Sequence, residues 1–182
     1  MFERPLYLKQ LINFKDHEQI KVITGIRRCG KSSLLDLFIE YLKSQNINDE
    51  NIIKINFENL KYADITYKEL NELIEKKACT SENKLYVFLD EVQKIDKWEL
   101  TVNSLRLNPK IDIYITGSNA YLLSSKLSTY LSGRYIEIKM QPLTFKEFLD
   151  FNKFDNDMPL ESKFNLYLKY GGMPGLKDFN FN

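Results

Sequence analysis

The sequence contains few of the residues that build covalent or metal-stabilised scaffolds. Its 182 residues include two cysteines, Cys29 and Cys79, and one histidine, His17. Two cysteines cannot supply the disulfide framework of a small secreted domain, and with a single histidine we expect no zinc site. His17 lies in a polar segment, where we expect it at the surface. Stability must therefore come from an apolar core, for which 43% hydrophobic residues are sufficient.

Long apolar runs and an excess of charge of one sign are also absent. No segment approaches the roughly 20 apolar residues that span a bilayer, and the N-terminal MFERPLYLKQ lacks the apolar core of a signal peptide. The 26 basic and 25 acidic residues leave a net charge of +1, without the basic footprint of a dedicated nucleic-acid binder. We therefore expect a cytoplasmic protein, in which a DNA-binding role would need a local patch.

Short apolar strands alternate with amphipathic helices along most of the chain. Because such alternation is typical of a parallel sheet covered by helices, the pattern predicts an α/β fold with about five mostly parallel strands. Strands are predicted at residues 20–24, 52–57, 85–89, 111–116 and 134–140, and helices at 31–43, 67–77, 98–107 and 121–131.

The composition changes after residue 140. Thr144 and Glu147 have the spacing of a capping box at a helix start, and a last helical pattern over 160–170 ends at Gly171. We predict a core over residues 1–140 and a helical, lid-like segment, incomplete in this sequence, over 141–182.

The strongest motif follows the first predicted strand, where residues 25–32 read G-I-R-R-C-G-K-S. This is the Walker A pattern G-x-x-x-x-G-K-[ST], in which backbone amides surround phosphates, the lysine reaches the β- and γ-phosphates, and the hydroxyl binds Mg²⁺. The helix that begins there points its positive end at the same phosphates. The predicted cofactors are ATP and Mg²⁺, and the predicted ATP-binding residues are Gly25, Ile26, Arg27, Arg28, Cys29, Gly30, Lys31, Ser32 and Ser33.

The two arginines of this loop are informative because only five of the 26 basic residues are arginine. A lysine-rich chain is expected to keep arginine where a planar fork of donors is useful. We expect Arg27 or Arg28 to face an acidic group, such as Glu58, or the nucleotide. Cys29 either occupies a variable loop position or makes nucleotide binding sensitive to oxidation.

A second motif ends the third predicted strand, where LYVFL is followed by Asp90 and Glu91. We predict that Asp90, with Ser32, binds Mg²⁺ directly or through water, and that Glu91 is the general base that activates water. The alternative is a solvated Asp-Glu turn. The segment between Lys31 and Asp90 has room for a helix, a strand and a helix, as in P-loop ATPases with an additional strand between the two motif strands.

Two further residues complete the predicted catalytic set of Glu91, Lys31, Ser118 and Arg134. Ser118, in I-T-G-S-N, ends the next strand and could contact the γ-phosphate or the attacking water, although G-S-N can also be a simple turn. Arg134 could stabilise charge in its own chain or on a neighbouring subunit, or it could be an ordinary surface charge.

Together, these motifs resemble a known family. G-I-R-R-C-G-K-S, L-D-E-V-Q-K, I-T-G-S-N, L-S-G-R-Y, P-L-T-F-K-E-F-L and Y-G-G-M-P-G are similar to the AAA-type ATPases of bacteria and archaea that usually carry a C-terminal restriction-endonuclease-like domain. The resemblance runs from Arg4 to Gly175. It implies a P-loop NTPase three-layer sandwich, with an AAA-like ATP-binding core over residues 1–140, Ser118 in the sensor position and Arg134 in a family G-R motif. Family members usually continue for about as long again, so no nuclease activity is assigned to these 182 residues.

Three functions are compatible with this sequence. The first is an ATPase motor or switch domain that hydrolyses ATP with Mg²⁺, within a homo-oligomer or beside DNA. The second is a module in which ATP orders a surface for a protein or DNA partner without appreciable hydrolysis. The third is a small-molecule kinase. It is less favoured because the sequence shows no acceptor-binding signature and nucleotide kinases generally lack a glutamate at the position of Glu91.

Overall fold

The structure is a computed structural model and describes residues 4–118, 131–152, 154–155 and 157–176. Within these ranges five strands form one sheet in the order β2-β3-β4-β1-β5, and every neighbouring pair is parallel. The strands are β1 (Ile20–Gly25), β2 (Ile52–Asn56), β3 (Leu85–Asp90), β4 (Ile111–Ser118) and β5 (Tyr135–Met140). The predicted α/β class is confirmed. The helix predicted at 121–131 lies outside the described residues except for Leu131.

Two different strands separate the two motif strands. β2 lies between β1 and β3 in the sequence but at the edge of the sheet, whereas β4 lies between them in the sheet itself. β4 therefore borders both motifs, and its carboxyl end pairs Gly25 with Ser118. Since all strands are parallel, the ends of β1, β3 and β4 meet at one edge of the sheet.

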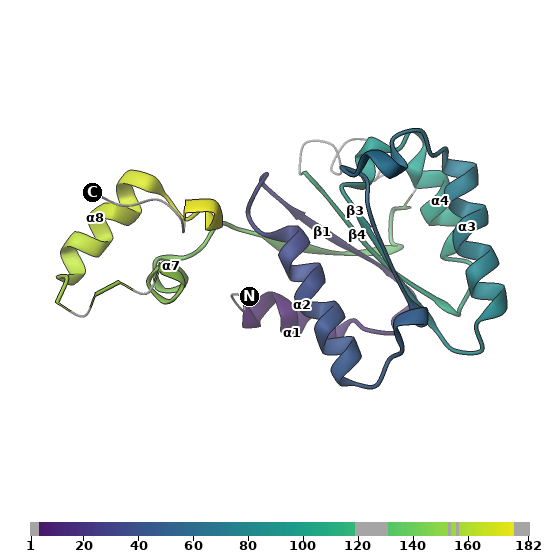
Figure 1. Ribbon diagram of the computed structural model, residues 1–182, viewed down its shortest axis with the longest axis horizontal. Coiled ribbons are helices and arrows are strands. Elements are labelled where there is room, and N and C mark those ends of the chain that lie inside the picture. Colours follow the sequence, from purple (N-terminus) through teal and green to yellow (C-terminus); the bar gives the residue numbers. More distant parts are fainter. Residues whose placement is uncertain (1–3, 119–130, 153, 156, 177–182) are drawn as a thin grey trace.

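Helices cover both faces of this sheet (Figure 1). On one face lie α1 (Pro5–Asn13) and α2 (Lys31–Ser44), and on the other lie α3 (Tyr67–Thr80) and α4 (Trp98–Leu105). β3 shows the consequence, because all six of its residues are buried. Tyr86 and Phe88 pack toward α1 and α2, while Leu85, Val87 and Leu89 pack toward α3 and α4. Each fully buried leucine side chain contributes about 1.5–3 kcal/mol.

The helix α1 was not predicted from the sequence. Its signals are a proline at the first helical position and the buried pair Tyr7 and Leu11, four residues apart on one face. The helix is only nine residues long, so its apolar periodicity is easy to overlook. It places the N-terminal segment beside α2 and β5.

The C-terminal helices α7 (Phe145–Asn152) and α8 (Leu160–Tyr170) stand beyond the end of β5, apart from the sheet (Figure 1). The capping box is confirmed: the Thr144 N–H donates to Glu147 Oε2 at 2.8 Å, and the Glu147 N–H donates to Thr144 Oγ1 at 3.3 Å. The two helices share an aromatic cluster in which the Phe145 and Phe164 rings lie 5.0 Å apart. On these grounds we propose the division into 1–140 and 141–182. No helix in the described ranges is long and apolar enough to cross a membrane.

Candidate functional site

The loop between β1 and α2 is tightly packed against β5. A Cβ atom at Gly25 would lie 2.7 Å from the Met140 carbonyl oxygen and 2.7 Å from Cys29 Sγ, so only glycine fits. Gly30 has φ +101°, a left-handed conformation that side chains disfavour. The spacing of the two glycines in the motif is therefore explained by backbone geometry, and the loop turns directly into the N-terminus of α2.

Lys31 extends into the interior of this loop. Its side chain is only 4% exposed, and Nζ donates to the carbonyl oxygens of Gly25 and Ile26, each at 3.3 Å. Nζ also lies 3.7 Å from Glu91 Oε1. The structure thus brings the predicted phosphate-binding lysine and the predicted general base together, although Glu91 follows Lys31 by 60 positions in the sequence.

Asp90 is fully buried at the end of β3. Its carboxylate accepts hydrogen bonds from the Thr116 hydroxyl and from Asn56 Nδ2, the latter at 3.1 Å. Within the part of the chain that the structure describes, no lysine, arginine or histidine nitrogen forms an ion pair with it. Because a buried carboxylate is costly without a compensating charge, this hard oxygen donor suits a divalent cation such as Mg²⁺.

Glu91 adopts a left-handed backbone conformation with φ +57°, which is uncommon outside glycine. Its N–H donates to Thr116 Oγ1 at 3.0 Å, and its Oε2 accepts a hydrogen bond from the Gln93 amide. Such strained residues persist where neighbours hold them and are frequent at functional sites. Here the turn leaves Glu91 Oε1 beside Lys31.

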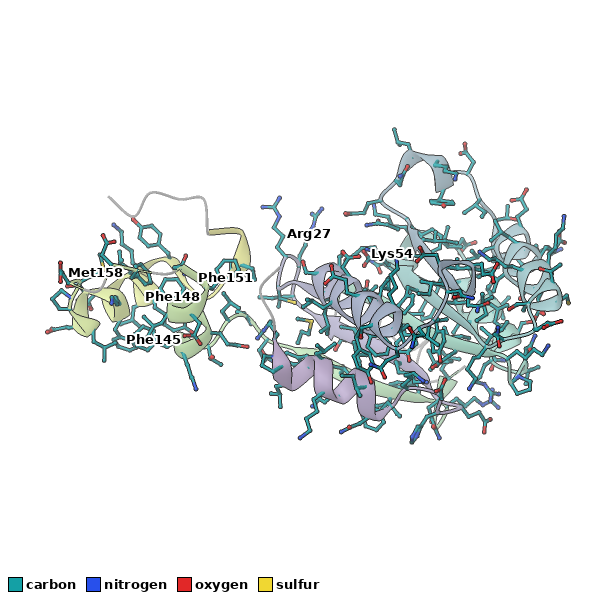
Figure 2. The ribbon with its side chains drawn as sticks, turned by 60° about the horizontal axis from the view of Figure 1, so that its bottom comes forward. Arg27, Lys54, Phe145, Phe148, Phe151 and Met158 are labelled. Atoms are coloured by element: carbon teal, nitrogen blue, oxygen red, sulfur yellow. The ribbon has the colours of Figure 1, made fainter. Side chains whose placement is uncertain are left out.

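A cavity of about 590 Å³ lies between the loop and the C-terminal segment. In Figure 2, Arg27 marks the loop side of this junction and Phe151 marks the α7 side. The polar wall comes from residues 27–33 with Glu58 and Glu91, and the apolar wall comes from Met140, Leu143, Phe151 and Pro174. A cavity with one charged and one apolar wall suits a ligand that combines phosphates with an aromatic base.

Comparison with known proteins decides the family. A family model described as an AAA domain matches residues 17–149, well over half of the chain. The chain belongs to this AAA-type P-loop ATPase family. An uncharacterised protein of Haemophilus influenzae is 47% identical over 178 residues, covering 97% of this chain and 44% of the relative. One from Methanocaldococcus jannaschii is 38% identical over 165 residues, covering 86% and 36%. The chain thus spans less than half the length of these relatives.

Solved structures share the fold of this AAA domain. A Walker-type ATPase of Pyrococcus abyssi superposes with a TM-score of 0.66 at 21% identity, covering 97% of this chain and 65% of the other. The ORC1 protein of Aeropyrum pernix, solved in complex with DNA, gives a TM-score of 0.57 at 13% identity, covering 91% and 50%. At these identities the likeness concerns the fold alone.

Most of the predicted ligand-binding residues of the AAA domain line the cavity. Arg27, Arg28, Cys29, Gly30, Lys31, Ser32, Ser33 and Glu91 all do so. The expected partner of a loop arginine is also present, because Arg27 Nη2 lies 3.8 Å from Glu58 Oε1. The two side chains are 80% and 49% exposed, so this pair contributes little to stability.

Of the two alternatives for Cys29, the structure favours a loop position without special reactivity over oxidation sensitivity. The side chain is fully buried and packs with the cluster under α1 and α2. Burial raises the pKa of the Cys29 thiol, so the reactive thiolate is disfavoured. The backbone of Cys29 still lines the cavity, but its sulfur belongs to the core.

Ser118 and Arg134 differ in where the sheet places them. The Ser118 backbone pairs with Gly25 at the loop, while its side chain and Asn119 lie outside the described residues. Arg134 precedes β5, whose first residue Tyr135 pairs with Ile20 at the opposite end of β1. Five residues of parallel strand separate that end from the loop by about 16 Å. Arg134 donates instead to Asn103 Oδ1 at 2.9 Å. The structure therefore does not bring Arg134 to the site of its own chain, and an action on a neighbouring subunit stays a prediction.

Besides the apolar wall of the cavity, four polar residues of the site were missed from the sequence: Arg4, Asn56, Gln93 and Thr116. Arg4 lines the cavity and is 5% exposed. The scarcity of arginine, which singled out Arg27 and Arg28, was a signal for Arg4 as well. The other three contact Asp90 or Glu91, and their contacts depend on strand order or on the turn after β3.

Proposed function

We propose that this AAA domain binds ATP in the cavity and hydrolyses it with Mg²⁺, as a motor or switch domain. The observation that carries the proposal is the convergence of Lys31, Asp90 and Glu91 at the carboxyl ends of β1 and β3. Open parallel sheets bind ligands at this edge. The family and the neighbouring structures support nucleotide binding, and the acidic pair beside Lys31 supports hydrolysis.

Binding follows from the loop and the start of α2. The Lys31 amino group now donates to two neutral carbonyl oxygens at 3.3 Å, and phosphate oxygens would offer stronger, charge-assisted hydrogen bonds. The amides at the N-terminus of α2 favour the same negative charge. The adenine base of ATP would lie against the apolar wall at Leu143 and Phe151. When bound by the Ser32 hydroxyl and by Asp90, directly or through water, Mg²⁺ would supply neutralisation of phosphate charge.

Hydrolysis requires Glu91 to accept a proton from water. In the structure Glu91 Oε1 lies 3.7 Å from Lys31 Nζ, so this oxygen is paired with the lysine. If Lys31 turns toward phosphates, Oε1 becomes free to accept the proton while the Gln93 amide still holds Oε2. Water then attacks the γ-phosphorus, the bond to the β-phosphate oxygen breaks, and ADP and inorganic phosphate are formed.

The test separates binding from turnover. Lys31→Ala should abolish binding of a fluorescent ATP analogue, because the residue that contacts the phosphates is lost. Glu91→Gln keeps the size of the side chain but removes the base, so binding should remain while steady-state phosphate release falls by about 10²-fold or more. Equal loss of binding in both variants would show that these roles are wrongly assigned.

A second candidate function is a nucleotide-gated module for a protein or DNA partner. The observation that favours it is that both carboxylate oxygens of Glu91 are engaged, one by Lys31 and one by Gln93. Such a module would bind ATP yet release no phosphate, with or without duplex DNA. Turnover that disappears in Glu91→Gln would exclude it. ADP formed without phosphate in the presence of an acceptor would instead indicate a kinase.

The ATPase proposal includes formation of a homo-oligomer, in which Arg134 acts on the next subunit.

A further inference from the structure

Arg4 uses every donor of its guanidinium group. Nε donates to Glu147 Oε1 at 2.9 Å, and Nη2 donates to Glu147 Oε2 at 3.0 Å and to the Pro142 carbonyl at 3.3 Å. Nη1 donates to the carbonyl oxygens of Gln141 at 2.7 Å and Cys29 at 3.4 Å. The five N–H groups of an arginine are therefore all directed to acceptors. With 5% exposure, the group is closely enclosed.

These acceptors belong to two segments that are far apart in the sequence. Cys29 lies within the loop that follows β1, whereas Gln141, Pro142 and Glu147 lie between β5 and the first turns of α7. Arg4 is thus a direct bridge from the phosphate loop to the C-terminal helices. Both segments also line the cavity, so the length of this bridge sets the distance between its walls.

Tyr7 supports the bridge that Arg4 forms. Its ring lies 4.6 Å from the Arg4 guanidinium carbon, and its hydroxyl oxygen accepts the Gln141 N–H at 3.1 Å. Because Tyr7 is buried in α1, its ring holds the Arg4 side chain in place. The contacts differ in strength, because the pair with Glu147 is bidentate and short while the contact with Cys29 is the longest. The loop contact is therefore the one that changes most readily when the loop rearranges.

We propose that Arg4 is a positioning residue that couples nucleotide occupancy of the loop at residues 25–32 to the position of α7. This inference rests on the proposed function, since it requires nucleotide in the cavity. Ordering of the loop by phosphates would fix the Cys29 carbonyl, and Arg4 would pass that restraint to Glu147 and the start of α7. A lysine cannot replace it, because an ammonium group has three donors and lacks the planar fork.

Hydrogen–deuterium exchange on the 182-residue protein, with and without MgATP, tests this coupling. In the wild type, nucleotide should slow exchange both at residues 26–35 and at residues 145–152. In Arg4→Lys, the protection at 26–35 should remain while the protection at 145–152 falls to the nucleotide-free level. The same variant should raise KM for ATP about 10-fold and change kcat less than twofold. The cavity walls would move, whereas the general base Glu91 would not.

Two further variants keep the test decisive. Glu147→Gln breaks the same bridge from the α7 side and should reproduce the loss if Arg4→Lys fails to fold. Arg106→Lys is the matched control. Arg106 Nη1 donates to Glu18 Oε1 at 3.3 Å, and this pair lies away from the cavity. α7 protection that survives in Arg4→Lys or Glu147→Gln, or that never appears in the wild type although the loop is protected, would overturn the coupling. Absence of loop protection in the wild type would instead contradict ATP binding itself.

Discussion

Thr116 donates a hydrogen bond from its hydroxyl to the carboxylate of Asp90. The same oxygen accepts the Glu91 N–H at 3.0 Å. One side chain on β4 therefore orients both acidic residues at the end of β3. The arrangement depends on β4 lying next to β3 in the sheet.

Replacement of Thr116 by valine should impair metal-dependent binding. Valine has nearly the same shape but removes one of the two donors to the buried Asp90, leaving only Asn56, and leaves the Glu91 N–H without its acceptor. We expect a stability loss of about 1–3 kcal/mol in urea unfolding and about a 10-fold lower affinity for MgATP. The affinity for ATP measured in EDTA, without Mg²⁺, should change little. Thr116→Ser retains the hydroxyl and should keep the wild-type stability and MgATP affinity. A Thr116→Val protein with wild-type MgATP affinity would contradict the orienting role.

The loop arginines should affect ligand affinity more than folding. Arg27 and Glu58 form an exposed pair at 3.8 Å, so exchange of Arg27 and Arg28 for lysine should change unfolding free energy by less than about 1 kcal/mol. We expect ATP affinity to fall several-fold, because a guanidinium can bind phosphate with two hydrogen bonds. Glu58→Gln removes the ion pair but keeps both arginines, so it should not reproduce the loss of affinity. Unaltered affinity and turnover in the double variant would show that the arginines are merely tolerated.

The attachment of α7 should weaken in acid. Burial would raise the pKa of Glu147, but hydrogen bonds from Arg4 and from the Thr144 N–H outweigh it, and the pKa lies below its ordinary value. A carboxylate with a lowered folded-state pKa stabilises the fold above its unfolded pKa of about 4.3, and this contribution is lost as pH falls through the folded pKa. Exchange protection of residues 145–152 should therefore drop below about pH 4 in the wild type. In Glu147→Gln the profile should be flatter, and an identical pH profile would refute the assignment.

A buried ion pair at the far end of the sheet should be important for stability. Lys21 on β1 and Asp112 on β4 are 0% and 1% exposed, and the Asp112 carboxylate also accepts the Tyr114 hydroxyl at 2.9 Å. Lys21→Ala leaves that buried charge uncompensated and should cost about 3–5 kcal/mol in chemical unfolding. Lys54→Ala, which removes an exposed pair with Asp36, should cost less than about 1 kcal/mol. Similar losses in the two variants would contradict this difference.

Local patterns in the sequence were sufficient to predict the strands and the phosphate loop. The apolar run before Asp90 predicted a strand buried on both faces, and the motif at Gly25–Ser32 predicted the loop and the start of α2, because both depend on neighbouring residues. The capping box at Thr144 is local in the same way, and it too is confirmed.

Contacts between distant segments could not be predicted in this way. Arg4 meets Glu147 across 143 positions, and no periodicity reports such a pair. Ser118 was predicted as a site residue and Thr116 was not. The role of Thr116 depends on the strand order that places β4 beside β3, and the sequence motif does not reveal that order. Arg134 follows a suggestive glycine, but only the register of β5 against β1 shows that it lies at the opposite end of the sheet.

Water, activated by Glu91, is the proposed acceptor of the γ-phosphoryl group. This role is tested most directly by incubating the protein with MgATP in water enriched in heavy oxygen and analysing the released phosphate by mass spectrometry. The wild type should incorporate one solvent oxygen per phosphate, and Glu91→Gln, although it still binds ATP, should release almost none. Labelled phosphate formed at the same rate by Glu91→Gln, or bound ATP that yields no phosphate in the wild type, would contradict this role.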